Sequence, residues 1–199
     1  MIKLKRTIIY IIILTLSIML FGCGDVYLNS LTAIDDNESG SVKLQIIYDD
    51  IIGSKLKKDI FDHKWVNENG YIFNKYSQGN MNVEEITYSF KNIKELEEKI
   101  NSSGLATMTY SKKAQMREKI NSIQLNFNKS NIDNLIKNST GNDEKIYNYI
   151  NNIKIHNEVK VPGKIVKSNT SVEVNENTRK WTYKLSQIDN NTSMSFSYR

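Results

Sequence analysis

The sequence predicts an α+β domain in which an antiparallel or mixed β-sheet has two to three helices packed on one face. Apolar and polar residues alternate strictly in some segments, as at 123–127, which is typical of half-buried strands. Other segments have apolar residues at helical spacing, as at 93–100. The 199 residues minus the first 22, which predict a signal peptide, leave 177, a length that suits one domain.

The first 22 residues predict the signal peptide of a bacterial lipoprotein. A basic start precedes an apolar run from Ile8 to Leu20, and the run ends in Leu20-Phe21-Gly22-Cys23. A secretory signal has a cationic flank and an apolar core of about 7 to 15 residues, whereas a stable membrane span needs about 20. We interpret the last four residues as a lipobox, in which Cys23 is lipidated and the chain is cleaved before it.

Cys23 is the predicted lipidation site because it is the only cysteine in the chain. A lone thiol in an exported protein forms no internal disulfide, and thioether attachment of diacylglycerol would consume it. Two acyl chains, such as palmitate, hold a protein durably on a bilayer. We therefore expect a lipid anchor on the extracytoplasmic face of the cell membrane. The alternative is an uncleaved signal anchor in which Cys23 is merely buried.

Residues 23–40 are expected to form a polar tether that ends in an acidic turn at 35–40, followed by a single domain over residues 41–199. Alternation over 42–48 predicts the first strand. Ser54 is a candidate N-cap for a helix that extends to Trp65 and is ended by Asn69-Gly70.

The middle of the chain alternates between strand and helix patterns. Residues 71–73 and 86–90 predict a hairpin with a long turn. Asn92 and Glu95 have capping-box spacing at the start of a helix that ends at 101–104. Further elements follow in order: strands at 106–110 and 123–127, and helical spacing over 131–151.

The C-terminal part is expected to form a β-meander. Its four strands are predicted at 153–161, 172–174, 181–185 and 194–198, with turn-rich segments between them. Pro162-Gly163 is expected to mark a bulge or a strand end, because proline cannot donate to a strand ladder.

The charge of the mature chain argues against nucleic-acid binding. Of 27 basic residues, three lie in residues 1–22, so 24 remain against 22 acidic ones, a net charge of +2. The signs are mixed, as at 94–99, a pattern typical of a solvated helix face rather than of a basic stripe. Abundant Asn, Ile and Lys are typical of AT-rich genomes and favour a low-GC Gram-positive source.

The sequence offers little chemistry for catalysis or metal binding. His63 and His156 are the only histidines, far apart and without an HExxH motif or a Cys/His cluster. The pair Glu84-Glu85 would point to opposite faces of a strand, and Asp49-Asp50 would stabilise a helix N-terminus. We therefore expect no enzyme activity, no metal and no cofactor.

Aromatic residues are the most informative set in the chain. We expect them on core-facing surfaces, where they either fill the core or line a cleft for an apolar ligand. They are Trp65, Tyr71, Phe73, Tyr88, Phe90, Trp181 and Tyr183. The sequence leaves both alternatives open and assigns no ligand-binding residue.

Several short motifs resemble the LppM-type domain of bacterial lipoproteins. They are the lipobox, the acidic turn at 35–40 before the first strand, a Gly-flanked hairpin, and Val161-Pro162-Gly163-Lys164 followed by the Trp181 strand. The likeness covers about residues 30 to 185. It implies an α/β sheet domain on the outer membrane face and lipid or glycolipid binding rather than catalysis. The chain departs from members with a C-terminal membrane segment, because residues 192–199 are polar and alternating.

Three functions follow from these observations. The first is a non-catalytic binding module for a lipid or another apolar envelope component. The second is a structural or assembly lipoprotein that docks a membrane protein partner, and the third, least favoured, is an envelope hydrolase. A large apolar cavity would favour the first, and a closed core with an exposed apolar patch the second.

Overall fold

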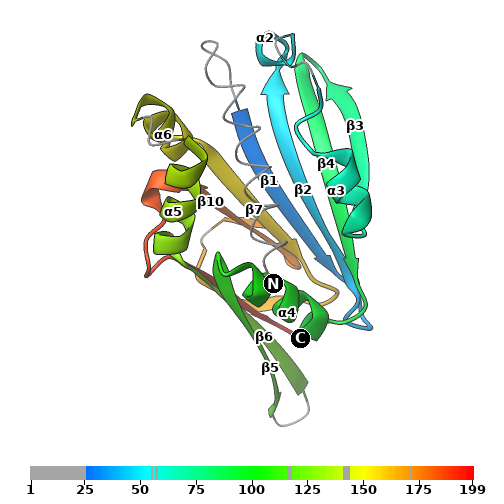
Figure 1. Ribbon diagram of the computed structural model, residues 1–199. Coiled ribbons are helices and arrows are strands. Elements are labelled where there is room, and N and C mark those ends of the chain that lie inside the picture. The colour runs from blue at the N-terminus through cyan, green and yellow to red at the C-terminus, as the bar shows by residue number, and fades with distance from the viewer. Residues whose placement is uncertain (1–25, 55, 57, 116–117, 141–143, 171) are drawn as a thin grey trace.

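The computed structural model describes residues 26–54, 56, 58–115, 118–140, 144–170 and 172–199. Two β-sheets and several helices build the domain (Figure 1), so the predicted α+β class is confirmed. The predicted signal peptide and Cys23 lie outside the described residues.

The larger sheet is mixed. Its strands are β1 (Val26–Ile34), β2 (Gly40–Asp49), β3 (Ile72–Gln78), β4 (Met81–Phe90), β7 (Lys154–Lys160), β9 (Glu173–Asn175) and β10 (Thr178–Lys184). They are arranged in the order β3-β4-β2-β1-β7-β10-β9. The pair β1 and β7 is parallel, and the other neighbours are antiparallel.

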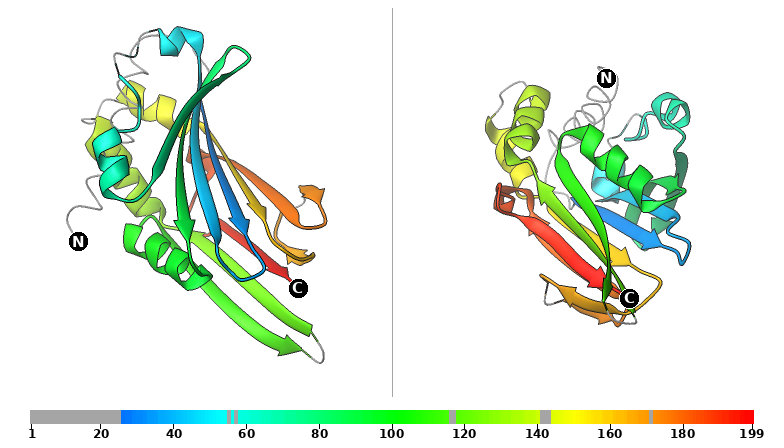
Figure 2. Two further views of the ribbon diagram at one scale, coloured as in Figure 1. Left: turned by 90° about the vertical axis from the view of Figure 1, so that its right-hand side faces the viewer. Right: turned by 90° about the horizontal axis from the view of Figure 1, so that it is seen from below.

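The smaller sheet is antiparallel and packs across one end of the larger one (Figure 2). Its strands are β5 (Ala106–Gln115), β6 (Glu118–Phe127), β8 (Ile165–Ser168) and β11 (Ser193–Tyr198), in the order β5-β6-β11-β8. The main core lies between the two sheets. Ile34 and Trp181 of the larger sheet share one buried cluster with Ile123 and Phe196 of the smaller sheet.

The prediction of a tether over residues 23–40 is wrong for residues 26–34, which form the strand β1. This strand pairs with β2 from Val26↔Tyr48 to Ile34↔Gly40 and also with β7. Sequence patterning missed it because the middle of its core-facing side carries Ser30 and Thr32 instead of apolar residues. The turn expected at 35–40 is present, since the N–H of Asp35 donates to the carbonyl oxygen of Ser39 at 2.8 Å.

The segment after β2 also differs from the prediction. A short helix, α2 (Asp50–Gly53), comes first, and Ser54 follows its end instead of starting a helix. The next helix, α3 (His63–Glu68), is capped by Asp62, whose carboxylate accepts a hydrogen bond from the N–H of Trp65 at 3.0 Å. Ile60 and Phe61 are buried without helical structure because the Glu84 carboxylate, not a helical carbonyl, accepts their N–H groups.

The other predicted helices and the hairpin are confirmed. The helix predicted to end at 101–104 is α4 (Ile93–Ser103). The helical spacing over 131–151 corresponds to two helices, α5 (Lys129–Thr140) and α6 (Glu144–Asn151). Asn92 caps α4, and Gly104, with φ 71°, ends it in the left-handed conformation that glycine tolerates. Between β3 and β4 the turn is tight, formed by Gly79 and Asn80, rather than long as predicted.

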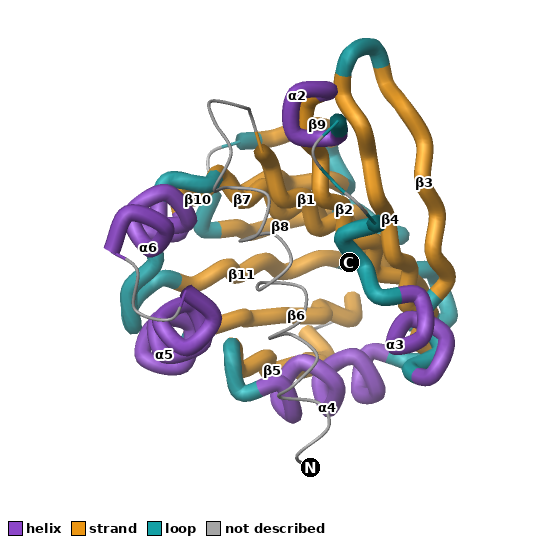
Figure 3. Tube along the Cα trace, turned by 45° about the horizontal axis from the view of Figure 1, so that its top comes forward, coloured by secondary structure: helices purple, strands orange, loops and turns teal. Residues whose placement is uncertain are grey.

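The helices α3 to α6 lie on the inner face of the larger sheet, the face that carries Leu28, Ile86 and Ile155. Apolar side chains of α5 pack towards Leu28 and Ile155, whereas α3 packs towards Ile86. In Figure 3, α5 and α6 lie at the left of the view, whereas α3 lies at the right and α4 at the bottom. This arrangement leaves the middle of the inner face between two pairs of helices.

The predicted C-terminal meander is wrong in its pairing, although its four strands exist as β7, β9, β10 and β11, and β8 was not predicted. β7, β9 and β10 belong to the larger sheet, whereas β8 and β11 belong to the smaller one. Pro162-Gly163 lies between β7 and β8, where the chain passes from one sheet to the other, so the predicted strand end is confirmed. A Cβ atom at Gly163 would collide with the backbone of Arg199. None of the described helices is both long and apolar enough to cross a membrane.

Candidate ligand cavity

A cavity of about 280 Å³ lies between the inner face of the larger sheet, the helices α3 and α4, and the smaller sheet. Its lining is predominantly apolar and includes Val42, Leu44, Ile86, Leu96, Ile100 and Met194. The volume is near the lower end of the range for ligand pockets, about 300 to 1,000 Å³. The cavity is therefore large enough for part of an apolar ligand.

The floor of the cavity is the centre of the larger sheet. Strand register places Ser30 of β1 between Leu44 of β2 and Asn157 of β7, and all three side chains line the cavity. Leu44 lies on the inner face but is 38% exposed, because its side chain borders the cavity. A strip of polar groups thus runs through an otherwise apolar floor.

One wall of the cavity is a row of aromatic rings. The ring centre of Tyr71 lies 5.0 Å from that of Trp65 and 5.7 Å from that of Tyr88. Burial is the main cause that raises the pKa of Tyr71. Burial, followed by the hydrogen bond to Glu95, raises the pKa of Tyr88 to about 12, so its hydroxyl stays neutral at physiological pH.

Lys99 of α4 places a positive charge at this wall. Its ammonium nitrogen lies 5.4 Å from the ring centre of Tyr71 and 5.2 Å from that of Tyr88, within cation–π range. None of the ion pairs formed among the described residues includes Lys99. Its charge also acts on Glu95, one turn earlier on α4, and can attract an anionic or oxygen-rich group in the cavity.

Trp65 also offers an unused donor. Its indole Nε1 is buried and has no hydrogen-bond acceptor in the described part of the chain. Buried donors are normally satisfied, because an unpaired one costs about 1 to 3 kcal/mol. The residue that lines the cavity on the α3 side thus has a polar group without a partner.

The predicted aromatic set divides between core and cavity. Trp65, Tyr71 and Tyr88 line the cavity, whereas Phe90 and Trp181 are buried in the main core. The remaining two, Phe73 and Tyr183, pack against core clusters.

Sequence reasoning missed the polar lining residues. Ser30 and Thr32 fell in the expected tether, and Lys99 fell in a charged run that suggested a solvated helix face. A signal was present for Lys99, which lies three residues after Leu96 and directly before Ile100. That spacing places it at the border of the apolar face of α4.

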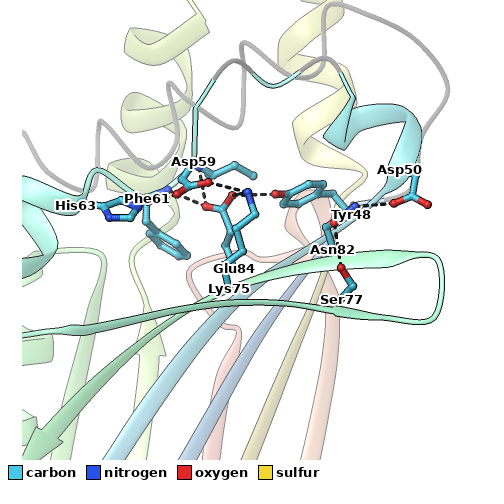
Figure 4. A network of polar contacts seen from close by, with 10 residues as sticks. Tyr48, Asp50, Asp59, Phe61, His63, Lys75, Ser77, Asn82 and Glu84 are labelled. Atoms are coloured by element: carbon cyan, nitrogen blue, oxygen red, sulfur yellow. Dashed lines mark hydrogen bonds and ion pairs between the residues drawn. The ribbon is translucent and has the colours of Figure 1, made fainter.

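The carboxylates of the Glu84-Glu85 pair point to opposite faces of the larger sheet, as expected. Glu84 lies on the inner face and is fully buried, whereas Glu85 lies on the outer face. The Glu84 carboxylate accepts hydrogen bonds from the Tyr48 hydroxyl at 2.8 Å and from the N–H groups of Ile60 and Phe61 at 2.6 and 3.1 Å (Figure 4). Both carboxylate oxygens thus accept hydrogen bonds, and these bonds hold the segment before α3 on the sheet.

The polar side chains around Glu84 also pair with one another. Lys75 lies 3.5 Å from Glu84 and donates to Asp59 at 2.6 Å, and this second contact is the main cause that raises the pKa of Lys75. Asp59 also contacts His63 at 2.7 Å. Burial first, then the bond to Glu84, raises the pKa of Tyr48, which keeps its hydroxyl a donor.

The second histidine and the Asp49-Asp50 pair make contacts of their own, apart from the His63–Asp59 contact. His156 lies on the outer face, where its Nδ1 is 2.9 Å from the hydroxyl oxygen of Thr182. Burial is the main cause that lowers the pKa of His156, followed by the positive charges of Lys180 and Lys154. The Asp49 carboxylate accepts the N–H of Ile52 and caps α2, as expected. Among the described residues, no three His, Cys, Asp or Glu side chains group as a metal site would require.

Comparisons with known proteins support the fold. No protein-family model matches the chain, and no curated protein matches it. Among solved structures, it is similar to the NMR structure of the folded domain of the LppM protein from Mycobacterium tuberculosis, with a TM-score of 0.53 and 13% sequence identity. The match covers 90% of this chain and 92% of that domain. The chain therefore has an LppM-like fold.

Proposed function

We propose that this protein is a lipid-anchored extracytoplasmic lipoprotein whose domain binds a lipid or another apolar envelope component without catalysis. The observation that carries the proposal is the cavity of about 280 Å³ lined mainly by apolar and aromatic side chains. Proteins normally close such spaces, because an empty apolar cavity lowers stability. The LppM-like fold and the lipobox at Cys23 support the same proposal.

The cavity suits an amphiphile better than a hydrocarbon. Apolar groups of the ligand would contact Leu44, Ile86 and Ile100, and each buried methylene contributes about 0.8 kcal/mol. An oxygen-bearing group would lie near Lys99, which carries the positive charge of the wall. The ligand would thus be oriented by its polar end.

Native mass spectrometry of the full lipoprotein, extracted from its own membranes, tests the proposal. We expect the wild type to retain a non-covalent lipid. Leu44→Trp, which fills the cavity from its floor, should lose at least half of that occupancy. Val174→Trp is the matched control, because Val174 is 52% exposed on β9 and does not line the cavity. Absence of any co-purifying apolar molecule, or equal occupancy in Leu44→Trp, would contradict the proposal.

A structural or assembly role is the second candidate. Val166, Val172 and Val174 are 45%, 50% and 52% exposed in the segment that contains β8 and the edge strand β9. Exposed apolar side chains beside an open strand edge are typical of docking surfaces. Crosslinking from position 174 to a membrane protein, together with an unliganded cavity, would favour this role.

A further inference from the structure

The length of chain between Cys23 and the first strand limits how far the domain can lie from its anchor. Only Gly24 and Asp25 separate Cys23 from Val26, the first residue of β1. A chain advances at most about 3.6 Å per residue, so Cys23 lies within about 11 Å of Val26 in any conformation. Lipidation of Cys23 would therefore bring the beginning of β1 to the bilayer surface.

The strand register identifies what else lies at that end of the domain. Val26 pairs with Tyr48, so β2 ends there and continues directly into α2. The turn between β3 and β4 is at the same end, because Asp49 pairs with Met81. In Figures 1 and 2, α2 and this turn lie at one end of the molecule and the β5–β6 hairpin at the other.

The chemistry of this end suits a membrane surface. Ile51 of α2 is 53% exposed, whereas its neighbour Ile52 is buried. Asn80 of the β3–β4 turn is exposed, and so are Lys154 and Lys184, which pair at the nearby ends of β7 and β10. The nearby acidic Asp50 accepts a hydrogen bond from Asn82 at 2.8 Å. An exposed apolar side chain and two exposed lysines at the same end of the domain are features of surfaces that bind anionic bilayers.

We propose that the domain rests on the membrane through the end that carries α2, with Ile51 entering the headgroup region of an anionic bilayer. This orientation rests on the proposed lipidation of Cys23. It places the cavity close to the bilayer, because Ser30, the first β1 residue in its lining, lies four residues after Val26, about 13 Å along the strand. The cavity is thus held beside the membrane rather than raised on a tether.

The test uses the full lipidated chain in vesicles that contain phosphatidylglycerol and phosphatidylcholine with brominated acyl chains. Cys23 is the only cysteine and would be consumed by the anchor, so a single new cysteine can carry a fluorophore. Ile51→Cys and Asn80→Cys report on the proposed contact. Ala114→Cys, exposed on the β5–β6 hairpin, is the control at the far end.

We expect quenching by the brominated lipids to be at least threefold stronger at position 51 than at 114, with position 80 between them. Equal quenching at 51 and 114 in protein that floats with the vesicles would overturn the orientation but not the anchor. Protein that fails to float would overturn the anchor and, with it, the orientation. All three positions are exposed, so the labelled variants are expected to fold.

Discussion

The ammonium nitrogen of Lys99 lies 5.2 Å from the ring centre of Tyr88, and Glu95, one turn earlier on α4, accepts a hydrogen bond from the Tyr88 hydroxyl at 2.8 Å. The helix therefore contacts this tyrosine with two opposite charges. Glu95 fixes the hydroxyl, while Lys99 remains over the ring face at the cavity. Glu95 and the two tyrosine rings thus stabilise the charge of Lys99 beside an apolar cavity.

Lys99→Gln should weaken the binding of an anionic amphiphile by about 2- to 30-fold, which corresponds to about 0.5 to 2 kcal/mol for a partly desolvated cation. The affinity is measured by titrating a fluorescent fatty acid into the purified lipoprotein in detergent. Lys94→Gln is the matched control, because Lys94 is exposed on the same helix and does not line the cavity. Equal affinities in wild type and Lys99→Gln would show that the charge makes no contact with the ligand.

Glu84→Ala should lower the free energy of unfolding by about 2 to 4 kcal/mol, because it leaves the buried N–H groups of Ile60 and Phe61 without an acceptor. Urea denaturation measures the change. Glu98→Ala, at an exposed position of α4, should stay within about 0.5 kcal/mol of wild type. A Glu84→Ala protein as stable as this control would show that Glu84 does not hold the segment before α3 on the sheet.

The stability of the domain should fall as the pH rises from about 10 to 12. The pKa of Tyr88 is raised from 10.0 to about 12, so in this window the folded state binds more protons than the unfolded state. Higher pH then favours unfolding, and the contribution is complete below pH 10. Tyr88→Phe should show a shallower decline in urea midpoint across this range. Other tyrosines with raised pKa values contribute to the remaining decline: Tyr48, Tyr71, Tyr110, Tyr183 and Tyr198. Identical pH slopes in both proteins would refute this.

Cys23→Ser should abolish the incorporation of labelled fatty acid and block cleavage after Gly22, because the thiolate is the nucleophile that takes up the lipid. Labelling is followed in cells, and mass spectrometry reports cleavage. An uncleaved signal anchor predicts a different outcome, in which wild type retains residues 1–22 and carries no label. Labelling that persists in Cys23→Ser would exclude Cys23 as the lipidation site.

Local patterns in the sequence were sufficient for most individual elements. The helix α4 was predicted from the Asn92 cap, the spacing of its apolar residues and Gly104, because these signals act within a few residues of one another. The strands β5 and β6 followed from strict alternation, since one face of their sheet is buried and the other is solvated. The opposite orientations of Glu84 and Glu85 also followed, because the side-chain period of a strand is two.

Interactions between distant segments decided what sequence patterning missed. β1 lies next to β7, and Tyr27 pairs with Lys154, a contact that no local pattern encodes. Ser30 and Thr32 line the cavity instead of packing in the core, and as polar residues they interrupt the apolar alternation of β1. Ile60 and Phe61 have helical spacing, yet their N–H groups donate to the carboxylate of Glu84 on β4 instead of to helical carbonyl groups.

The sequence by itself determined the α+β class, most of the strands and helices, and the predicted anchor at Cys23, because hydrophobic periodicity, capping residues and a short N-terminal signal are local properties. The tertiary structure alone decided that residues 26–34 are a central strand instead of a tether, and that Trp65, Tyr71, Tyr88 and Lys99 meet around one cavity. These four residues come from α3, α4, β4 and the segment before β3. Their proximity depends on how two sheets pack, which is a property of the whole chain.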